Sequence, residues 1–131
     1  MAFGTATVIT RGGFAIITNR LMDALTAASP RWVGIGTGAT GADRTAAATD
    51  TALSTEVETR GEGTESQQTT TETNDTYQVV GVVTASEARD VDEMGLFNAL
   101  EDGTMFLSAT HAAINLATND SLQYTAKMDV A

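Results

Sequence analysis

Short runs of strand-forming residues, separated by turn residues about every ten positions, most restrict the fold of this chain. Turn residues stand at 101–103 and 119–120, and the segment 121–130 alternates apolar and polar side chains. We expect 91–110 to form a hairpin, with Gly95 as a possible bulge. Strands in this half are predicted at 77–85, 91–99, 105–110 and 121–130.

The first half adds three weaker strands. A strand is predicted at 3–9 and ends at Gly12-Gly13, a short buried strand follows at 32–36, and an exposed edge strand at 55–60. The total is about seven strands, a rhythm typical of sandwiches and barrels rather than of βαβ units. The predicted fold class is mainly β: an antiparallel β-sandwich or jelly-roll-like open barrel with one short helix.

The single predicted helix lies between the first two strands. Thr18 or Asn19 is a suitable N-cap, and Leu21, Met22 and Leu25 follow at helical spacing. Pro30 disfavours helical geometry at the residue before it and ends the helix. A helix of about ten residues is marginal alone in water, so we expect it to pack on the sheets.

Two long connections interrupt the pattern. Residues 37–50 are mainly Gly, Ala and Thr, and loops of this length are uncommon unless they bind something. Residues 61–76 are almost entirely polar, yet Thr is a good strand former. We expect an exposed strand there, or a loop held by a partner. The whole chain, 1–131, reads as one domain with an extended N-terminal segment.

The predicted core is light, because many apolar residues are Ala and only seven are aromatic Phe, Tyr or Trp. Burial contributes roughly 25 cal/mol per Å², and Ala buries little area. We therefore expect neighbouring subunits to supply further burial. The residues assigned to the core are Trp32, Phe97, Phe106, Leu107, Leu122 and Tyr124.

The net charge of −10 excludes several partners. Nucleic-acid affinity comes largely from Lys and Arg neutralising phosphates, whereas Lys127 is the one lysine and the six arginines are scattered. Anionic membranes are disfavoured for the same reason. No run approaches about 20 apolar residues, and no signal peptide is apparent, so we expect the protein to stay in the compartment where it is made until it leaves as part of a larger particle.

Two motifs resemble ligand sites. The segment 36–41 matches GxGxxG after a strand, but a dinucleotide site needs a helix starting at its last glycine, and we predict a plain turn. Asp90, Asp92 and Glu101 have the spacing of a calcium loop. Met94 is a poor ligand at its fifth position, so solvated carboxylates before a strand are the alternative, and cation binding stays open.

His111 is the only histidine, and the chain has no cysteine. A nucleophilic triad needs a histidine, but the GxSxG motif that holds the serine nucleophile in many hydrolases is absent. One histidine without cysteine supplies too few ligands for a typical zinc site. No pair stands out among the seventeen acidic residues. We expect a structural or interface role for His111, with no catalytic residue, no cofactor and no metal, and therefore not an enzyme.

Residues 91–99 in the C-terminal half have the sequence VDEMGLFNA. This segment resembles the signature (I/V)-T-E-(A/I)-G-L-F-(N/D)-A of tailed-phage virion structural proteins. Residues 103–107, GTMFL, resemble the GG-x-M-(L/F) continuation, and the segment 114–122 resembles IN(V/L) followed by GDSL. The chain departs from the pattern at Met94 and at Asn119, where a turn glycine is usual.

The resemblance implies a capsid decoration, or cement, protein that is synthesised in the host cytoplasm and lies on the outside of a phage head. Such a protein bridges subunits of the major capsid protein and forms a homotrimer; a tail, collar or fibre-adaptor protein is the alternative. We expect its interfaces at 2–9, 38–51 and 62–76, because edge strands and extended arms pair with neighbours. A carbohydrate- or calcium-binding module is a third hypothesis, and a hydrolase using His111 comes last.

Overall fold

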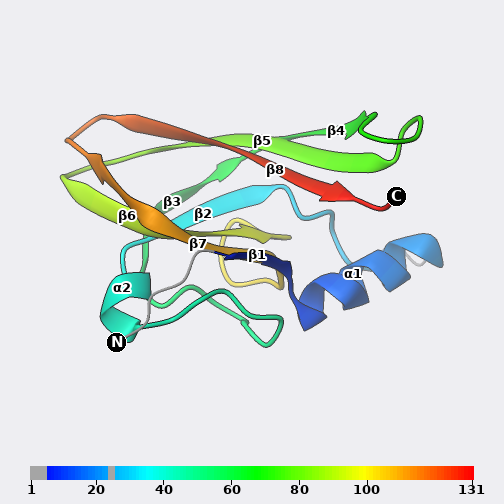
Figure 1. The fold of residues 1–131 in the computed structure, drawn as a ribbon, viewed down its shortest axis with the longest axis horizontal. Coiled ribbons are helices and arrows are strands. Elements are labelled where there is room, and N and C mark those ends of the chain that lie inside the picture. The colour runs from blue at the N-terminus through cyan, green and yellow to red at the C-terminus, as the bar shows by residue number, and fades with distance from the viewer. Residues whose placement is uncertain (1–5, 24–25) are drawn as a thin grey trace.

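Two antiparallel sheets face each other in the computed structural model, which describes residues 6–23 and 26–131 (Figure 1). The large sheet has the strand order β1-β7-β6-β2-β3, and the small sheet has the order β4-β5-β8. The mainly β, sandwich-like class predicted from the sequence is confirmed. The elements are β1 (Ala6–Ile9), α1 (Arg11–Leu21), β2 (Trp32–Gly36), α2 (Ala39–Ala42), β3 (Glu56–Glu62), β4 (Thr64–Gln68), β5 (Thr76–Thr84), β6 (Arg89–Phe97), β7 (Met105–Leu116) and β8 (Ser121–Asp129).

The chain crosses between the sheets at three places. Gly63 alone separates β3 of the large sheet from β4 of the small one, residues 85–88 connect β5 to β6, and a turn at 117–120 joins β7 to β8. Asn119 takes a left-handed φ of 72° in that turn, a conformation that Asn tolerates. Between β1 and β8, no strand pairing joins the two sheets in the described ranges. The sandwich is therefore open on that side.

Both sheets contribute to one main core. Val33 and Ile35 of β2 are fully buried together with Val79 of β5, and Leu96 and Phe106 pack in the same cluster. Of the predicted core residues, Phe106 and Leu107 are buried in this core, and the half-buried Leu122 and Tyr124 pack against it. Phe97 is buried in a second, smaller cluster, against which the half-buried Trp32 packs. Leu122 and Tyr124 are only partly covered because β8 is an edge strand.

The predicted position of the helix is wrong. The helix α1 begins after Thr10, whose hydroxyl accepts a 3.0 Å hydrogen bond from Gly13 N, and it ends at Leu21. Gly12-Gly13 therefore opens the helix instead of breaking the chain. A Cβ on Gly13 would lie 2.3 Å from the Phe106 carbonyl, so the glycine lets α1 approach β7 closely.

Two further predictions changed in detail. Gly95 is not a bulge, because it pairs regularly with Ser108, and the irregularities of β6 fall between Val91 and Glu93 and between Leu96 and Phe97. The hairpin 91–110 and its turn are confirmed, with Asp102 and Gly103 at positive φ. The predicted strand at 32–36 matches β2, and the edge strand at 55–60 matches β3. Residues 3–5 and 24–25 of the predicted elements lie outside the described residues.

Replacing Thr10 by Ala tests where the helix begins. The buried Thr10 hydroxyl caps α1 and also donates to Met105 O, so Thr10→Ala should lower the free energy of unfolding by about 1–3 kcal/mol. Thr10→Ser keeps the hydroxyl and should recover most of the loss in chemical denaturation. Thr18→Ala should cost far less, because Thr18 is an exposed residue inside the helix. A larger effect at Thr18 would contradict this helix start.

Candidate functional site

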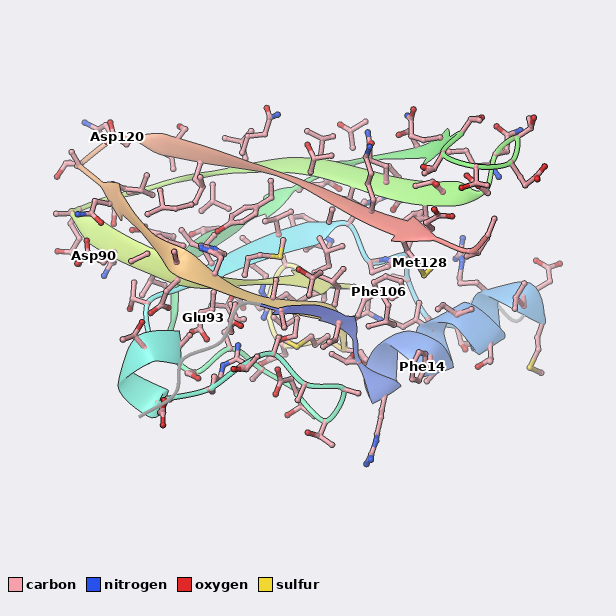
Figure 2. All side chains as sticks on the ribbon, in the orientation of Figure 1. Phe14, Asp90, Glu93, Phe106, Asp120 and Met128 are labelled. Carbon is pink, nitrogen blue, oxygen red and sulfur yellow. The ribbon has the colours of Figure 1, made fainter. Side chains whose placement is uncertain are left out.

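Two adjacent carboxylates in β6, Asp92 and Glu93, hold the long connection 37–55 against the large sheet. Figure 2 labels Glu93. Both residues are buried, with exposed fractions of 3% and 0%. Neighbouring residues of a regular strand point to opposite faces. The irregularity between Val91 and Glu93 interrupts that alternation and lets both side chains bind the same segment.

Glu93 is saturated with donors. Its Oε1 accepts from Ser54 N at 3.0 Å and from Arg44 Nε and Nη2 at 3.1 and 2.9 Å, and its Oε2 accepts from Thr55 N at 2.8 Å. Gly38 N also donates to Oε2 at 3.4 Å. A buried charge is tolerated only when it is paired and hydrogen-bonded. Glu93 meets this requirement with donors from one loop, so its burial depends on that loop.

Asp92 binds the first turn of α2. Its two carboxylate oxygens accept from Ala39 N at 3.0 Å and Thr40 N at 2.9 Å. In a phosphate site, such N–H groups would face the ligand. The predicted plain turn at 36–41 therefore contains the start of a four-residue helix, but its donors are occupied by the chain's own carboxylate. A Cβ on Gly36 would lie 2.3 Å from Glu93 Oε2, which explains the first glycine of the motif.

Arg44 extends this cluster to Asp50. Its Nη1 lies 2.6 Å from Asp50 Oδ2, which also accepts from Ala47 N and from the Ser108 hydroxyl. Burial opposes ionisation of Asp50, but the N–H of Ala47, the Ser108 hydroxyl and Arg44 together hold its pKa below the ordinary value. Every carboxylate in the cluster accepts several hydrogen bonds, an arrangement that suits holding a loop rather than transferring protons.

The calcium-loop residues are not brought together. Asp90 lies near the start of β6 and Glu101 lies in the turn beyond its end, and both side chains are exposed. Because a strand advances about 3.3 Å per residue, the length of β6 keeps these two carboxylates apart. Asp92 is buried between them and engaged with α2. Across residues 6–23 and 26–131, no group of three or more His, Asp or Glu side chains is arranged to hold a metal ion.

His111 connects the two sheets at the open side. Its Nε2 lies 2.7 Å from the Tyr124 hydroxyl of β8, and its Nδ1 lies 2.8 Å from Ala112 O. Burial raises the pKa of Tyr124 above its ordinary value, so the phenol stays protonated at neutral pH. Both ring nitrogens are thus engaged within the fold, which fits a structural role.

The polar stretch 62–76 is ordered by its own residues. Its first part forms the edge strand β4, so the predicted exposed strand is confirmed. In the turn that follows, the Asp75 carboxylate accepts from the backbone N–H groups of Thr70, Thr71 and Glu72 at 2.9, 2.9 and 2.6 Å. These N–H groups, Glu72 first, hold the pKa of Asp75 well below its ordinary value.

An apolar groove lies between α1 and the end of the small sheet. The exposed fractions of Phe14, Leu21 and Met22 on and beside α1 are 53%, 79% and 77%. The groove has a volume of about 320 Å³. Sequence reasoning missed this surface, because it placed Leu21 and Met22 on the packed face of a later helix. Residues lining the α1 groove include Ile16, Ile17, Leu21, Tyr77, Phe106 and Met128.

Comparisons with protein-family models, with curated proteins and with solved structures found no match to this chain. No helix in the described part of the chain is long and apolar enough to span a bilayer.

Replacing Glu93 by Gln tests whether the carboxylate fixes the loop. A glutamine amide at this position cannot accept all the bonds made by Glu93 and leaves Arg44 without one of its two carboxylates. Glu93→Gln should therefore lower the free energy of unfolding by about 3–5 kcal/mol and speed amide exchange across 38–55. The exposed Glu101→Gln, which removes the same charge, should change stability by less than about 0.5 kcal/mol. Equal effects would contradict the anchoring role.

Acid titration tests the Asp75 turn. A carboxyl whose pKa is lower in the folded protein than in the unfolded chain stabilises the fold above the unfolded pKa, about 3.9 for Asp, and loses that contribution as the pH falls. Asp75→Asn should therefore be less stable than the wild type at pH 7, and the difference should shrink below about pH 4. Unfolding followed at pH 7 and pH 3 measures it; a difference that does not change with pH would contradict the assignment.

Proposed function

We propose that this chain is a structural protein of a tailed-phage virion that decorates the capsid. It binds the outside of the head and bridges neighbouring subunits of the major capsid protein. The resemblance of residues 91–99 to phage virion proteins narrows the class. The structural observation that carries the proposal is the exposed apolar surface of α1 beside its groove.

Soluble proteins seldom leave a contiguous apolar patch open to water unless it binds a partner. Leu21 and Met22 each retain more than three-quarters of their surface beside a groove floored by core residues such as Phe106. Fully burying such a side chain contributes about 1.5–3 kcal/mol. On a shell with many equivalent sites, even weak contacts of this size sum to strong attachment when copies are linked.

The structure also gives the motif a physical role that supports the proposal. In the E-x-G-L-F pattern of this chain, the glutamate is Glu93, which anchors the loop 37–55, while Leu96 and Phe97 are buried in the core. A Cβ on Gly95 would lie 2.9 Å from the Phe97 ring, so the glycine leaves room for that ring. These residues of the pattern pack in the core or anchor the loop. We therefore expect proteins with this pattern to share this fold.

Charge is compatible with an exterior position. A net charge of −10 keeps the chain soluble and away from packaged DNA. Within α1, in contrast, Arg11 and Arg20 are exposed and no acidic residue is present. The exposed surface of α1 therefore carries positive charge, in contrast to the chain as a whole. A tail, collar or fibre-adaptor role uses the same surface and is the alternative.

Reconstitution on heads tests the proposal. The purified chain should bind heads assembled from the capsid protein of the same phage, and Leu21→Ser with Met22→Ser should weaken binding at least about tenfold without loss of folding. Leu100→Ser, which removes another exposed leucine from a different surface, is the matched control. Cryo-electron microscopy that places the chain only in tails would overturn the decoration role in favour of the alternative.

A further inference from the structure

The edge of β8 is the longest unpaired strand edge in the described structure. Its nine residues pair with β5 on one side, and no described strand pairs with it on the other (Figure 1). Exposed edges of this length template pairing with another chain, and proteins commonly block them with prolines, bulges or charges. β8 has no proline, and its register with β5 is regular over all nine pairs.

The hydrogen bonds at the ends of β8 show which backbone groups face outward. Val130 N donates to Asp75 O at 3.0 Å, and Ala85 N donates to Asp120 O at 2.8 Å. In an antiparallel pair, alternate residues exchange bonds with the partner strand. The even-numbered residues of β8 are therefore bonded to β5, and the N–H and C=O groups of the odd-numbered residues point to the free edge. These residues are Ser121, Gln123, Thr125, Lys127 and Asp129.

The side chains of β8 leave room for another strand. Those that point inward are all only half-buried, and two hollows of about 220 and 160 Å³ lie between β8 and the edge of the large sheet, with Leu107 lining both. An added strand would extend the small sheet and cover this open side. The inward-pointing side chains are Leu122, Tyr124, Ala126 and Met128.

Charge favours a second copy as the occupant. Two copies carrying −10 each repel over most of their surfaces. The outer face of β8, however, carries one positive and one negative charge, Lys127 and Asp129, which cancel. The residues paired with it in β5 on the same face, Gln78, Val80, Val82 and Thr84, are uncharged. Copies can therefore approach through this edge without the repulsion that other surfaces would cause.

We propose that β8 pairs antiparallel with β8 of a second copy, with Thr125 on the two-fold axis. This register uses all nine residues of each strand and joins the two small sheets into one of six strands. Outside, Gln123 lies opposite Lys127 of the second copy, and inside, Leu122 lies opposite Met128. Centring on Lys127 instead would place two ammonium groups face to face, which is destabilising. The contact is self-complementary, as a two-fold interface requires.

This inference goes beyond the proposed function, because it concerns how copies meet rather than what they decorate. The β8 pairing predicts a dimer, whereas the phage resemblance implies a trimer. The mass of the free protein in solution therefore discriminates between the two oligomeric states. Sedimentation should find two copies at micromolar concentration. A mass of one copy or of three would overturn the β8 pairing.

Cysteine cross-linking tests the register, because the natural chain has no cysteine. In the proposed pairing, the Cα atoms of residue 125 in the two copies lie about 5.5 Å apart, within disulfide range. Thr125→Cys should form a covalent dimer rapidly under mild oxidation at low protein concentration. Gln123→Cys is the matched control, since it is equally exposed on the same face but its two copies would be separated by on the order of 14 Å.

The cross-linking result decides the register. Fast dimer formation by Thr125→Cys alone supports the proposed register, whereas equal yields of dimer for both variants, or no dimer for either variant, overturn it. Thermal unfolding of the reduced variants controls for damage to the fold. A chain that cross-links as predicted but is absent from heads would overturn the decoration role alone, and a chain found on heads without this cross-link would overturn the β8 pairing alone.

Discussion

The burial of Glu93 is the constraint on which much of the molecule depends. A carboxylate without solvent exposure needs several donors, and here they come from Arg44 and from the backbone of a loop that would otherwise be poorly held. Asp92 makes the same demand on α2. The loop then covers the face of the large sheet opposite the small sheet, where α2 and the following segment lie in Figure 1. The hydrogen bonds that the two buried carboxylates need thus keep one face of the large sheet covered, in a chain whose apolar side chains are mostly small.

The strands of the second half could be predicted because their signals are local. Alternation over β8 and turn residues such as Asn119 need no distant partner to be recognised. The helix was misplaced because Gly12-Gly13 looks like a break, whereas close packing against β7 decides its conformation. Asp92 was interpreted as a calcium-loop residue because of its spacing from Asp90 and Glu101, and neither Asp92 nor Glu93 was recognised as an anchor of the loop. The sequence signal for both residues is that they are the only charged positions in the segment 91–97, whose other residues are apolar or Gly.

The candidate surfaces lie on separate parts of the molecule and differ in chemistry. The α1 groove is apolar and bordered by an arginine-bearing helix, whereas the outer face of the small sheet mixes polar side chains with Val80 and Val82 and is nearly uncharged. A protein that joins copies of itself and also binds a shell needs two such surfaces. Loop 69–75 is stabilised within the chain by Asp75, so the polar stretch keeps its shape before any partner arrives.

The pairing of β1 with β7 has a consequence for how the chain is made. Ala6 lies opposite Thr110, and the Thr10 hydroxyl bonds to Met105, contacts that span about three-quarters of the sequence. Closing a loop of this size costs entropy before any contact forms, so such topologies fold slowly. On the ribosome, the first strand and α1 must wait until most of the polypeptide has emerged. The exposed apolar surface of α1 is then one of the last parts of the molecule to reach its final position.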